Sequence, residues 1–408
     1  MLATRPRRTS SRARRASVVL FTAAALTGAI AAPAGATPLA DKTPGAGIVS
    51  GRTAAQGSGV DLAAGRTTAA QLAAARNPAA APAATGKGGD WQTMDALSGV
   101  VKDISFASKK VGYAAGELGV VWKTTDSGTT WTRVLNVGFP LYFYGVAALS
   151  ADEVVISGFD NQAGSAVVWR STDGGATWGS KLSFPQGWGG RVRFTDDQHG
   201  LLAGLTGSQV WSTQTGGETA DDWTFAQPDP VENGWIGSQF TLLPSQRAYL
   251  SGISFCRSND GGVGWKCGDS VDPVFDGPTE FVSKKVGWVG GGTISPDVEG
   301  WIHRTTDGGK NWSDRTLDGD WPVRHIEAID DTYVWAMAGD AYSGQGGIYY
   351  SDDGGQTWSI NTETGSEMTS CDHRAIKGGA QTRLWCVGYA NTGSWVSHVY
   401  RLTVPTPS

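Results

Sequence analysis

Cysteine, methionine and histidine are scarce in this sequence: its 408 residues include only four Cys, four Met and five His. After residue 89 no stretch shows the repeat of apolar side chains that is typical of an amphipathic helix, which disfavours an α/β fold. The histidines lack metal-ligand spacing, and there is no Gly-x-Ser-x-Gly segment, so neither a zinc site nor an α/β-hydrolase is indicated. No segment beyond the N-terminal region is long and apolar enough to cross a bilayer.

The first 36 residues have the composition of a secretory signal peptide. They contain six Arg and no acidic residue, with an apolar run at 18–32 and the small residues Ala-Gly-Ala at 34–36. A basic start, a short apolar run and a small-residue cleavage site are the parts of such a signal. We therefore expect a secreted protein, exported by the Sec route or, because of Arg14 and Arg15, by the twin-arginine route.

Residues 37–88 are rich in Ala, Gly, Thr and Pro and have few large apolar side chains, which predicts a disordered linker. Cleavage after Ala36 leaves 27 basic and 38 acidic residues, a net charge of −11. Such an acidic protein is a poor candidate for binding nucleic acid or anionic membranes. We expect a monomer with no membrane span after signal cleavage and no cofactor.

The four cysteines form two pairs that are close in sequence. An even number in an exported protein indicates disulfides, and nearness predicts the pairs Cys256–Cys267 and Cys371–Cys386. The first pair brackets one copy of the repeated motif described next, which suits facing positions on a hairpin. A metal site is the alternative, but neither pair has the Cys-x-x-Cys spacing of zinc ligands.

An eight-residue motif, here called the box, recurs along the chain. The copies are "TTDSGTTW" at 124–131, "STDGGATW" at 171–178, "SNDGGVGW" at 258–265, "TTDGGKNW" at 305–312 and "SDDGGQTW" at 351–358. Their Asp residues are separated by 47, 87, 47 and 46 residues, and the long interval contains a degenerate copy at 213–223 in which Thr215 replaces the Asp. A fixed period of this length indicates a repeat architecture.

Each box follows a β-branched or aromatic run and precedes another apolar segment, which predicts a β-hairpin turn. In such a turn the Asp carboxylate accepts backbone N–H groups, the Gly takes a backbone shape that other residues resist, and the Trp packs against the sheet. A calcium loop or phosphate loop is the alternative, but one carboxylate per box is too few for calcium, and no helix follows. The predicted structural residues are Asp126, Trp131, Asp173, Trp178, Asp260, Trp265, Asp307, Trp312, Asp353 and Trp358.

Two further short strands precede each hairpin, and four strands per unit of this length are typical of a β-propeller blade. Six hairpins can be counted. The seventh unit has three strands before the chain ends, whereas residues 86–97 supply a lone strand at the other end. We therefore predict an all-β, seven-bladed β-propeller over 89–404, closed by pairing of its N- and C-terminal strands, which removes two exposed sheet edges.

The box resembles the Asp-box, or BNR, repeat "SxDxGxTW". The cadence "ISFASKKVGYAAGELGVVWKTTDSGTTW", repeated in "VGWVGGG" and "WIHRTTDGGKNW", most resembles the photosystem II assembly factors of the Ycf48/HCF136 family. More distant resemblances are to sialidases, xyloglucan-type glycosidases and sortilin-type receptors. The closest resemblance implies an exported, non-catalytic, seven-bladed propeller that binds a partner protein. The resemblance to this family is clear over residues 98–360 and weaker over residues 361–404.

The alternative is a glycoside hydrolase of the same repeat class. The sialidase branch implies an Arg-Ile-Pro motif, which this chain lacks, and the xyloglucanase branch implies two Asp across a cleft, commonly in a longer chain with two propellers. A facing pair of carboxylates about 5–10 Å apart would favour glycoside hydrolysis. The candidate acids are Asp276, Glu280, Asp320, Glu327 and Asp372.

The segments that join one blade to the next open onto the channel of a propeller, and here they are rich in aromatic residues. Aromatic side chains combined with Arg are typical of binding hot spots and also of sugar sites. The alternative is that these side chains pack between blades. The candidate ligand-binding residues are Tyr142, Tyr144, Trp188, Arg191, Arg193, Trp235, Trp321, Arg324, His325 and Arg374. We predict a module that binds a protein or a glycan through its channel face.

Overall fold

The computed structural model describes residues 88–185, 187–204, 209–228, 239–252, 254–268, 277–293, 298–340 and 344–406. The predicted signal peptide at 1–36 and all but the last residue of the predicted linker at 37–88 lie outside these ranges. Two candidate residues, Trp235 and Asp276, also lie outside them.

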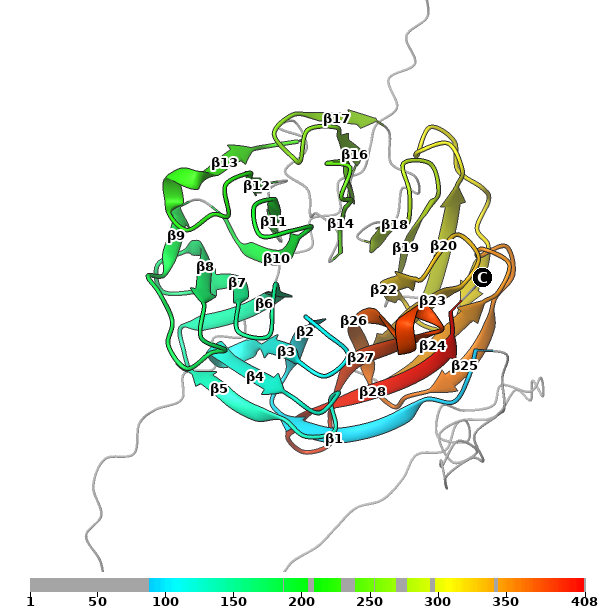
Figure 1. Ribbon diagram of the computed structural model, residues 1–408. Helices are drawn as coiled ribbons and strands as arrows, with labels where there is room; N and C mark the ends of the chain where they lie inside the picture. The colour runs from blue at the N-terminus through cyan, green and yellow to red at the C-terminus, as the bar shows by residue number, and fades with distance from the viewer. Residues whose placement is uncertain are drawn as a thin grey trace, which may run out of the picture. The chain divides into compact units, whose positions relative to one another are not determined.

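Seven four-stranded antiparallel sheets form a ring of blades around a central channel, which confirms the predicted seven-bladed propeller (Figure 1). Blades 1 to 3 comprise β2 (Val101–Phe106), β3 (Gly112–Gly116), β4 (Val120–Thr124), β5 (Thr132–Asn136); β6 (Leu141–Ala148), β7 (Val154–Asp160), β8 (Ser165–Ser171), β9 (Leu182–Pro185); and β10 (Gly189–Phe194), β11 (Gly200–Gly204), β12 (Val210–Thr213), β13 (Trp223–Ala226). Blade 4 comprises β14 (Thr241–Leu242), β15 (Ala248–Ser251), β16 (Phe255–Ser258) and β17 (Trp265–Gly268).

Blades 5 and 6 comprise β18 (Thr279–Phe281), β19 (Gly287–Thr293), β20 (Glu299–Thr305), β21 (Leu317–Gly319); and β22 (Val323–Ala328), β23 (Val334–Asp340), β24 (Gln345–Ser351), β25 (Ser359–Glu363). Blade 7 comprises β26 (Glu367–Ile376), β27 (Gln381–Asn391), β28 (Trp395–Pro405) and β1 (Gln92–Ser98). The helical elements of the described residues are the short 3₁₀ turns η1 (Glu117–Gly119), η2 (Ala220–Asp222) and η3 (Lys377–Gly379).

The two ends of the described chain close the ring, as the split seventh unit predicted. The N-terminal strand β1 pairs antiparallel with the C-terminal strand β28, from Gln92 opposite Arg401 to Ser98 opposite Val396. Just before β1, the Trp91 indole N–H donates to the Asn361 side chain of blade 6 at 2.7 Å. The first strand in sequence is therefore the outermost strand of the last blade.

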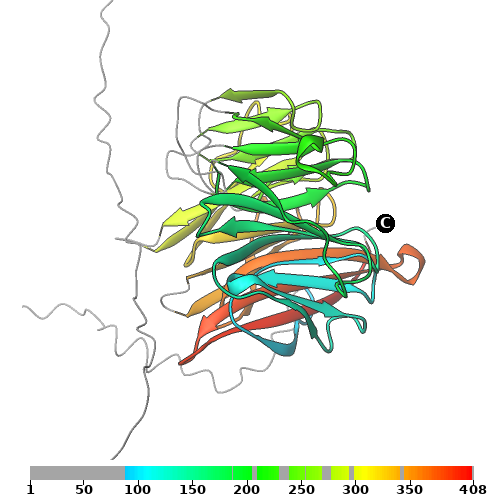
Figure 2. The same ribbon diagram turned by 90° about the vertical axis from the view of Figure 1, so that its left-hand side faces the viewer.

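The two faces of the ring carry different connections. The inner strands β2, β6, β10, β14, β18, β22 and β26 line the channel. The segments that lead into them, such as 137–140 and 320–322, define what we call the joint face. The boxes connect the third and fourth strands of a blade and lie at the opposite end, the box face, beside the hairpins that follow the inner strands. There the Ser127 N–H, for example, donates to the Lys110 carbonyl at 2.9 Å. Figure 2 shows the strands running between these two faces.

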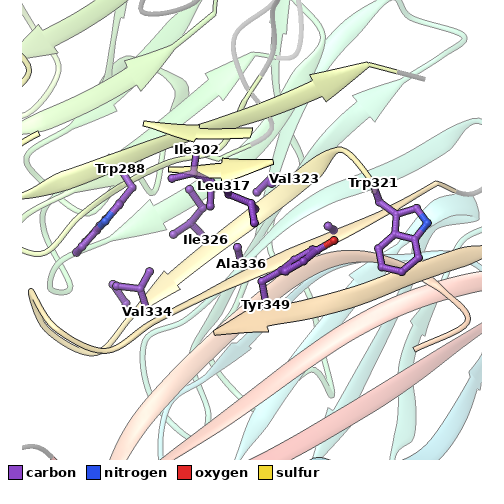
Figure 3. Packing of buried hydrophobic residues seen from close by; sticks show 11 residues of the cluster. Trp288, Ile302, Leu317, Trp321, Val323, Ile326, Val334, Ala336 and Tyr349 are labelled. Atoms are coloured by element: carbon purple, nitrogen blue, oxygen red, sulfur yellow. The ribbon is translucent and has the colours of Figure 1, made fainter. Parts of the chain in front are cut away.

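The core consists of apolar clusters between neighbouring blades. In one cluster, Trp288 and Ile302 of blade 5 pack with Ile326 and Tyr349 of blade 6 (Figure 3). Trp321 lies in the same cluster and is 6 % exposed. The alternating apolar residues of each strand thus form the packed interface between neighbouring blades, as expected for sheets packed face to face.

Within a box, the side chains organise the turn. In the first copy, Asp126 Oδ1 accepts the Thr130 N–H at 2.8 Å, and the Thr124 hydroxyl donates to Asp126 Oδ1 at 2.9 Å. The Gly128 N–H donates to that same hydroxyl at 3.0 Å, and the Trp131 indole donates to the Gly128 carbonyl at 3.1 Å. These contacts give a physical reason for Ser or Thr at the first position, Asp at the third and Trp at the last.

The degenerate copy keeps part of this pattern with different residues. The Trp223 indole N–H donates to the Gly217 carbonyl at 3.1 Å, as Trp131 does to Gly128. The carboxylate comes from Asp222, which accepts the Thr219 N–H at 2.7 Å. The inserted residues therefore move the turn acid to a later position in the sequence.

A side chain from one blade repeatedly donates to the box of the next blade. Arg170 of blade 2 donates to the Gly216 carbonyl of blade 3 at 2.8 Å, and Arg257 of blade 4 donates to the Gly308 carbonyl of blade 5 at 3.2 Å. Both arginines immediately precede the first residue of their own box. The basic residue at this position is thus a link between blades as well as a part of its strand.

Candidate functional site

A buried ion cluster crosses the channel in the middle. The Asp103 carboxylate of blade 1 accepts Arg191 Nη1 at 3.1 Å and Arg193 Nη1 at 2.7 Å, both from blade 3. The Ser370 hydroxyl of blade 7 donates to the same carboxylate at 2.6 Å, and the Val146 N–H of blade 2 donates to it at 2.9 Å. One acidic side chain on β2 therefore ties four blades together.

The charges of this cluster compensate for its burial. Burial alone would raise the pKa of Asp103, but the guanidinium groups of Arg193 and Arg191 lower it to about 2. Burial lowers the pKa of Arg191 to about 10, against the opposing effect of Asp103. The interaction with Asp103 outweighs burial at Arg193 and raises its pKa. All three side chains remain charged at neutral pH, so the cluster is a permanent bridge across the channel.

A cavity of about 240 Å³ occupies the channel and receives residues from all seven inner strands. Its walls are formed by residues near the ends of those strands and just beyond them, including Leu149 after β6 and Phe194 at the end of β10. The cavity therefore lies toward the box face, not at the joint face. Its polar lining residues are Ser105, Arg193, Gln239, Thr241, Glu280, His325, Glu327, Asp372 and Arg374.

Glu327 is held between two histidines on one side of this cavity. Its Oε2 is 3.0 Å from His325 Nε2, and its Oε1 is 2.6 Å from His373 Nδ1 of blade 7. Burial would raise the pKa of Glu327, but the two imidazole hydrogen bonds lower it. The pKa of His373 is raised because the bond and charge of Glu327 outweigh burial, whereas burial dominates at His325 and lowers its pKa.

Glu280 on β18 is the second carboxyl group of the cavity. Its Oε2 accepts the Gln239 amide at 3.0 Å and the Thr241 hydroxyl at 3.3 Å. Burial and the nearby charge of Glu327 raise the pKa of Glu280 well above its usual value. The two glutamates therefore differ in acidity: the pKa of Glu280 is raised, whereas that of Glu327 is lowered.

Asp372 and Arg374 on β26 complete the polar lining. The Asp372 carboxylate accepts the Phe106 N–H of blade 1 at 2.6 Å and Arg374 Nη1 at 2.6 Å. The Arg374 side chain is 36 % exposed, the largest exposed fraction among the ion-paired residues of this cavity. Arg374 is therefore the charged group of the cavity that is most open to a ligand.

The joint end of the channel has a different composition. The Lys102 ammonium is 3.2 Å from the Tyr389 hydroxyl and 3.2 Å from Glu117, and it lies 4.4 Å from the centre of the Tyr389 ring. Burial disfavours the charged form, but the interactions with Tyr389 and Glu117 raise the pKa of Lys102. Tyr142 and Tyr144 on β6 are half-buried, and burial raises the pKa of Tyr144.

Exposed apolar side chains lie on the connections of this face. Phe139, in the joint before β6, is 64 % exposed, and Trp188, in the joint before β10, is 45 % exposed and stacks on Phe159 at 4.5 Å. Leu118 and Trp395 lie in or beside the connections between second and third strands, which reach the same face, and are 52 % and 43 % exposed. Apolar side chains gathered on one face are typical of an interaction surface.

The structure separates the sequence-predicted candidates into four groups. Tyr142, Tyr144, Trp188 and Arg324 lie toward the joint face, where Arg324 is 3.6 Å from Glu367. Arg191 lies in the buried ion cluster; Arg193, His325 and Arg374 line the cavity. Trp321 packs in the core between blades 5 and 6, so its ring is not at the channel mouth. Of the candidate acids, Glu280, Glu327 and Asp372 share the cavity.

Asp103 and His373 are the functional candidates that sequence reasoning missed. Asp103 lies within the apolar run "VKDISF", where a charged residue on an inner strand is a usable signal for a buried ion pair. His373 is flanked by Asp372 and Arg374 in "CDHRA", a density of charge unusual for a strand. Both signals indicate charged residues in the channel interior.

Within the described ranges no group of three or more His, Cys, Asp or Glu residues is arranged to hold a metal ion. In that same part of the chain no helix has the length and apolar character needed to cross a membrane.

The two disulfides are Cys256–Cys267 and Cys371–Cys386. The predicted pairing is therefore the one present.

No protein-family model and no curated protein matches the sequence. Among solved structures, the chain is similar to YCF48 bound to a D1 peptide, with a TM-score of 0.56 and 16 % identity over 80 % of this chain and 99 % of that one. It is also similar to YCF48 from Cyanidioschyzon merolae, with a TM-score of 0.55 and 19 % identity over 76 % and 98 % of the two chains. These similarities support the fold.

A third similar structure is the GH74 enzyme of Niastella koreensis, with a TM-score of 0.53 and 15 % identity over 72 % of this chain. The match covers 52 % of that enzyme, so the chain spans about half of its length. The same propeller fold thus occurs in a binding factor and in an enzyme, and the fold alone does not decide between these functions.

Proposed function

We propose that the chain is an exported, non-catalytic propeller that binds a partner protein through its joint face. The observation that carries this proposal is the set of exposed apolar side chains on the connections of the joint face, including Phe139 and Trp188. Large aromatic side chains supply much of the binding energy at protein interfaces. Lys102 and Arg324 lie among them and give the surface polar contacts of defined position.

Two further observations support it. A neighbour of similar fold is described as bound to a D1 peptide, which is a precedent for peptide binding by such a ring. Export is supported by the disulfides Cys256–Cys267 and Cys371–Cys386, because disulfides persist in oxidising compartments, and by the signal-like N-terminal sequence.

The test is capture from the exported fraction of the producing cell with a photo-crosslinking residue at position 188. The matched control carries the crosslinker at Phe225, an aromatic residue that is 52 % exposed on the outer strand β13. A protein crosslinked at 188 but not at 225, and lost when Phe139 is changed to Ser, supports the proposal. Equal capture at both positions, or none at 188, contradicts it.

Glycoside hydrolysis is the second candidate, and one observation favours it. Glu280 and Glu327 share a cavity and have opposite pKa shifts, the pattern of a general acid beside an ionised carboxylate. It is the weaker candidate because both oxygens of Glu327 accept imidazole N–H groups. A carboxylate so engaged is a poor base and a poor nucleophile.

The measurement is release of reducing ends from xyloglucan and from a sialylated glycan. Turnover that disappears in the Glu280→Gln variant supports the hydrolase. Turnover that is unchanged in that variant comes from another source, and an absence of turnover leaves the binding function as the proposal.

A further inference from the structure

The cavity at the box end of the channel has more free hydrogen-bond donors than free acceptors. Arg374 uses Nη1 for Asp372 and the His373 carbonyl, whereas its Nε and Nη2 have no partner among the described residues. Arg193 uses Nη1 and Nη2, and its Nε is without a partner in the same ranges. Glu280 Oε1 likewise has none, and in the neutral acid one carboxyl oxygen carries a proton to donate.

The carboxylate acceptors of the cavity are already occupied, and His325 Nδ1 is the one buried acceptor of its described lining that has no partner. The Asp372 carboxylate accepts hydrogen bonds from the backbone N–H groups of Phe106 and His373 and from the Arg374 guanidinium. Both oxygens of Glu327 accept imidazole N–H groups. A ligand that fills this cavity therefore has to bring acceptors. These guanidinium N–H groups are partly exposed, so they are accessible to a ligand, and charged donors form the stronger hydrogen bonds.

The charge balance indicates the same chemistry. Three sets of opposite charges lie in or next to the cavity: Arg191 and Arg193 with Asp103, Arg374 with Asp372, and Glu327 with His373, which is charged when protonated and whose pKa is raised. The first set carries one excess positive charge, and the other two are balanced. Glu280 offsets that excess only when it ionises, and its pKa is raised by burial and by the nearby charge of Glu327. The cavity is thus suited to a single anionic group.

We propose that the channel cavity binds the carboxylate of a small organic acid, held by Arg193 and Arg374 beside the carboxyl group of Glu280. The volume of about 240 Å³ suits a small molecule, since it corresponds to about eight waters at about 30 Å³ each. The guanidinium groups pair with the carboxylate oxygens, and Glu280, when it is protonated, donates a charge-assisted hydrogen bond to one of them. This site is separate from the joint face and does not depend on the partner proposed there.

Binding by this arrangement is linked to protons. The charged and titratable groups around Glu280 are Glu327 and His325 on β22, Arg193 on β10, and Asp372, His373 and Arg374 on β26. When Glu280 ionises, its charge repels the bound carboxylate and its donor is lost. When His373 loses its proton, the positive excess disappears. Both changes weaken the affinity as pH rises, so ligand binding favours proton uptake.

The experiment is calorimetric titration of the mature protein with acetate, lactate and succinate, and with N-acetyl-alanyl-alanine, which presents the same group at the end of a peptide. We expect a free acid to bind in a 1:1 ratio, with a dissociation constant that rises at least about tenfold between about pH 6 and about pH 9. Arg374→Gln should weaken binding at least about tenfold, because it removes a charged donor. Glu280→Gln should keep binding at the lower pH and show a smaller rise, since its amide donates but cannot ionise.

Arg383→Gln is the matched control, because Arg383 lies on β27 and donates to Thr403 away from the cavity. Circular dichroism melting of each variant separates lost binding from lost folding. Several results would overturn the proposal: no binding by the free acids, binding by the peptide alone, tighter binding at higher pH, or an Arg374→Gln variant with unchanged affinity.

Discussion

The indole of Trp385 in blade 7 donates a hydrogen bond to the Ser127 carbonyl in the box of blade 1, at 2.9 Å and across 258 positions of sequence. The same ring stacks on Phe106 of blade 1 with 3.7 Å between ring centres. Tyr249 and Phe281 repeat the stack between blades 4 and 5 at 3.7 Å. The aromatic stack between the last and first blades is therefore of the same kind as the stack between two consecutive blades. The interface between blades 7 and 1 is thus built like an interface inside the ring.

Replacing Trp385 by Leu is expected to destabilise the protein by about 3 kcal/mol, because it removes a fully buried aromatic side chain and leaves a cavity. Urea denaturation followed by circular dichroism measures the change. The control is Trp395→Leu, since Trp395 is 43 % exposed, and its effect should stay within about 0.5 kcal/mol. Equal effects of the two substitutions would show that the closing contact contributes little.

Replacing Asp103 by Asn is expected to cost about 3–5 kcal/mol, because it leaves the buried guanidinium groups of Arg191 and Arg193 without their counter-charge. Thermal denaturation of the variant measures this loss. Asp318→Asn on the exposed edge strand β21 is the comparison. A variant Asp103→Asn as stable as the Asp318→Asn protein would mean that the ion cluster is not needed for the fold.

The Asp carboxylates of the boxes are expected to make the stability of the fold sensitive to acid. Hydrogen bonds from the turn lower the pKa of Asp353 and of Asp307 to about 2, and in Asp353 they outweigh the effect of burial. A carboxyl group with a lowered folded-state pKa stabilises the fold above its unfolded pKa of about 3.9 and loses this effect as pH falls. The loss should thus occur between about pH 4 and about pH 2. Stability measured across this range should fall less steeply in Asp353→Asn, and an unchanged slope would contradict the assignment.

The two disulfides are expected to differ in reactivity toward a reductant. Cys371 and Cys386 are 3 % and 0 % exposed, whereas Cys267 is exposed on β17. Under native conditions dithiothreitol should therefore reduce Cys256–Cys267 first, since thiol–disulfide exchange requires access to a sulfur. Alkylation followed by peptide mass spectrometry gives the order. Simultaneous reduction of both would indicate that the protein opens globally before either bond reacts.

The blade count and the closing strand could be predicted from the sequence because both follow from local patterns. The period between Asp126, Asp173, Asp260, Asp307 and Asp353 fixes one hairpin per blade. The last unit lacks a fourth strand, and a lone strand lies at 92–98. Pairing this strand with the last unit is the arrangement that completes the seventh blade. Strand alternation and turn chemistry are local, and a sequence displays them directly.

The candidate site was less predictable because it depends on which residues meet across the channel. Arg191 and Arg193 are two residues apart on one strand, but Arg191 is 6 % exposed in the ion cluster, whereas Arg193 also reaches the cavity. Trp321 occurs in a joint, as Trp188 does, yet it turns into the core beside Tyr349. These outcomes depend on side-chain direction and on packing between blades, which spacing along the chain does not encode.

The pairing of β1 with β28 also determines how the ring responds to a pulling force. The N-terminal end of β1 lies opposite the C-terminal end of β28, with Gln92 facing Arg401. Tension applied to the N- and C-terminal ends therefore breaks the hydrogen bonds between β1 and β28 one pair at a time. A shear geometry would instead load all of these bonds together. Just ahead of this ladder, the Asn361 side chain of blade 6 is bonded to both Trp91 and Gly89, so these contacts have to break before the ladder can open.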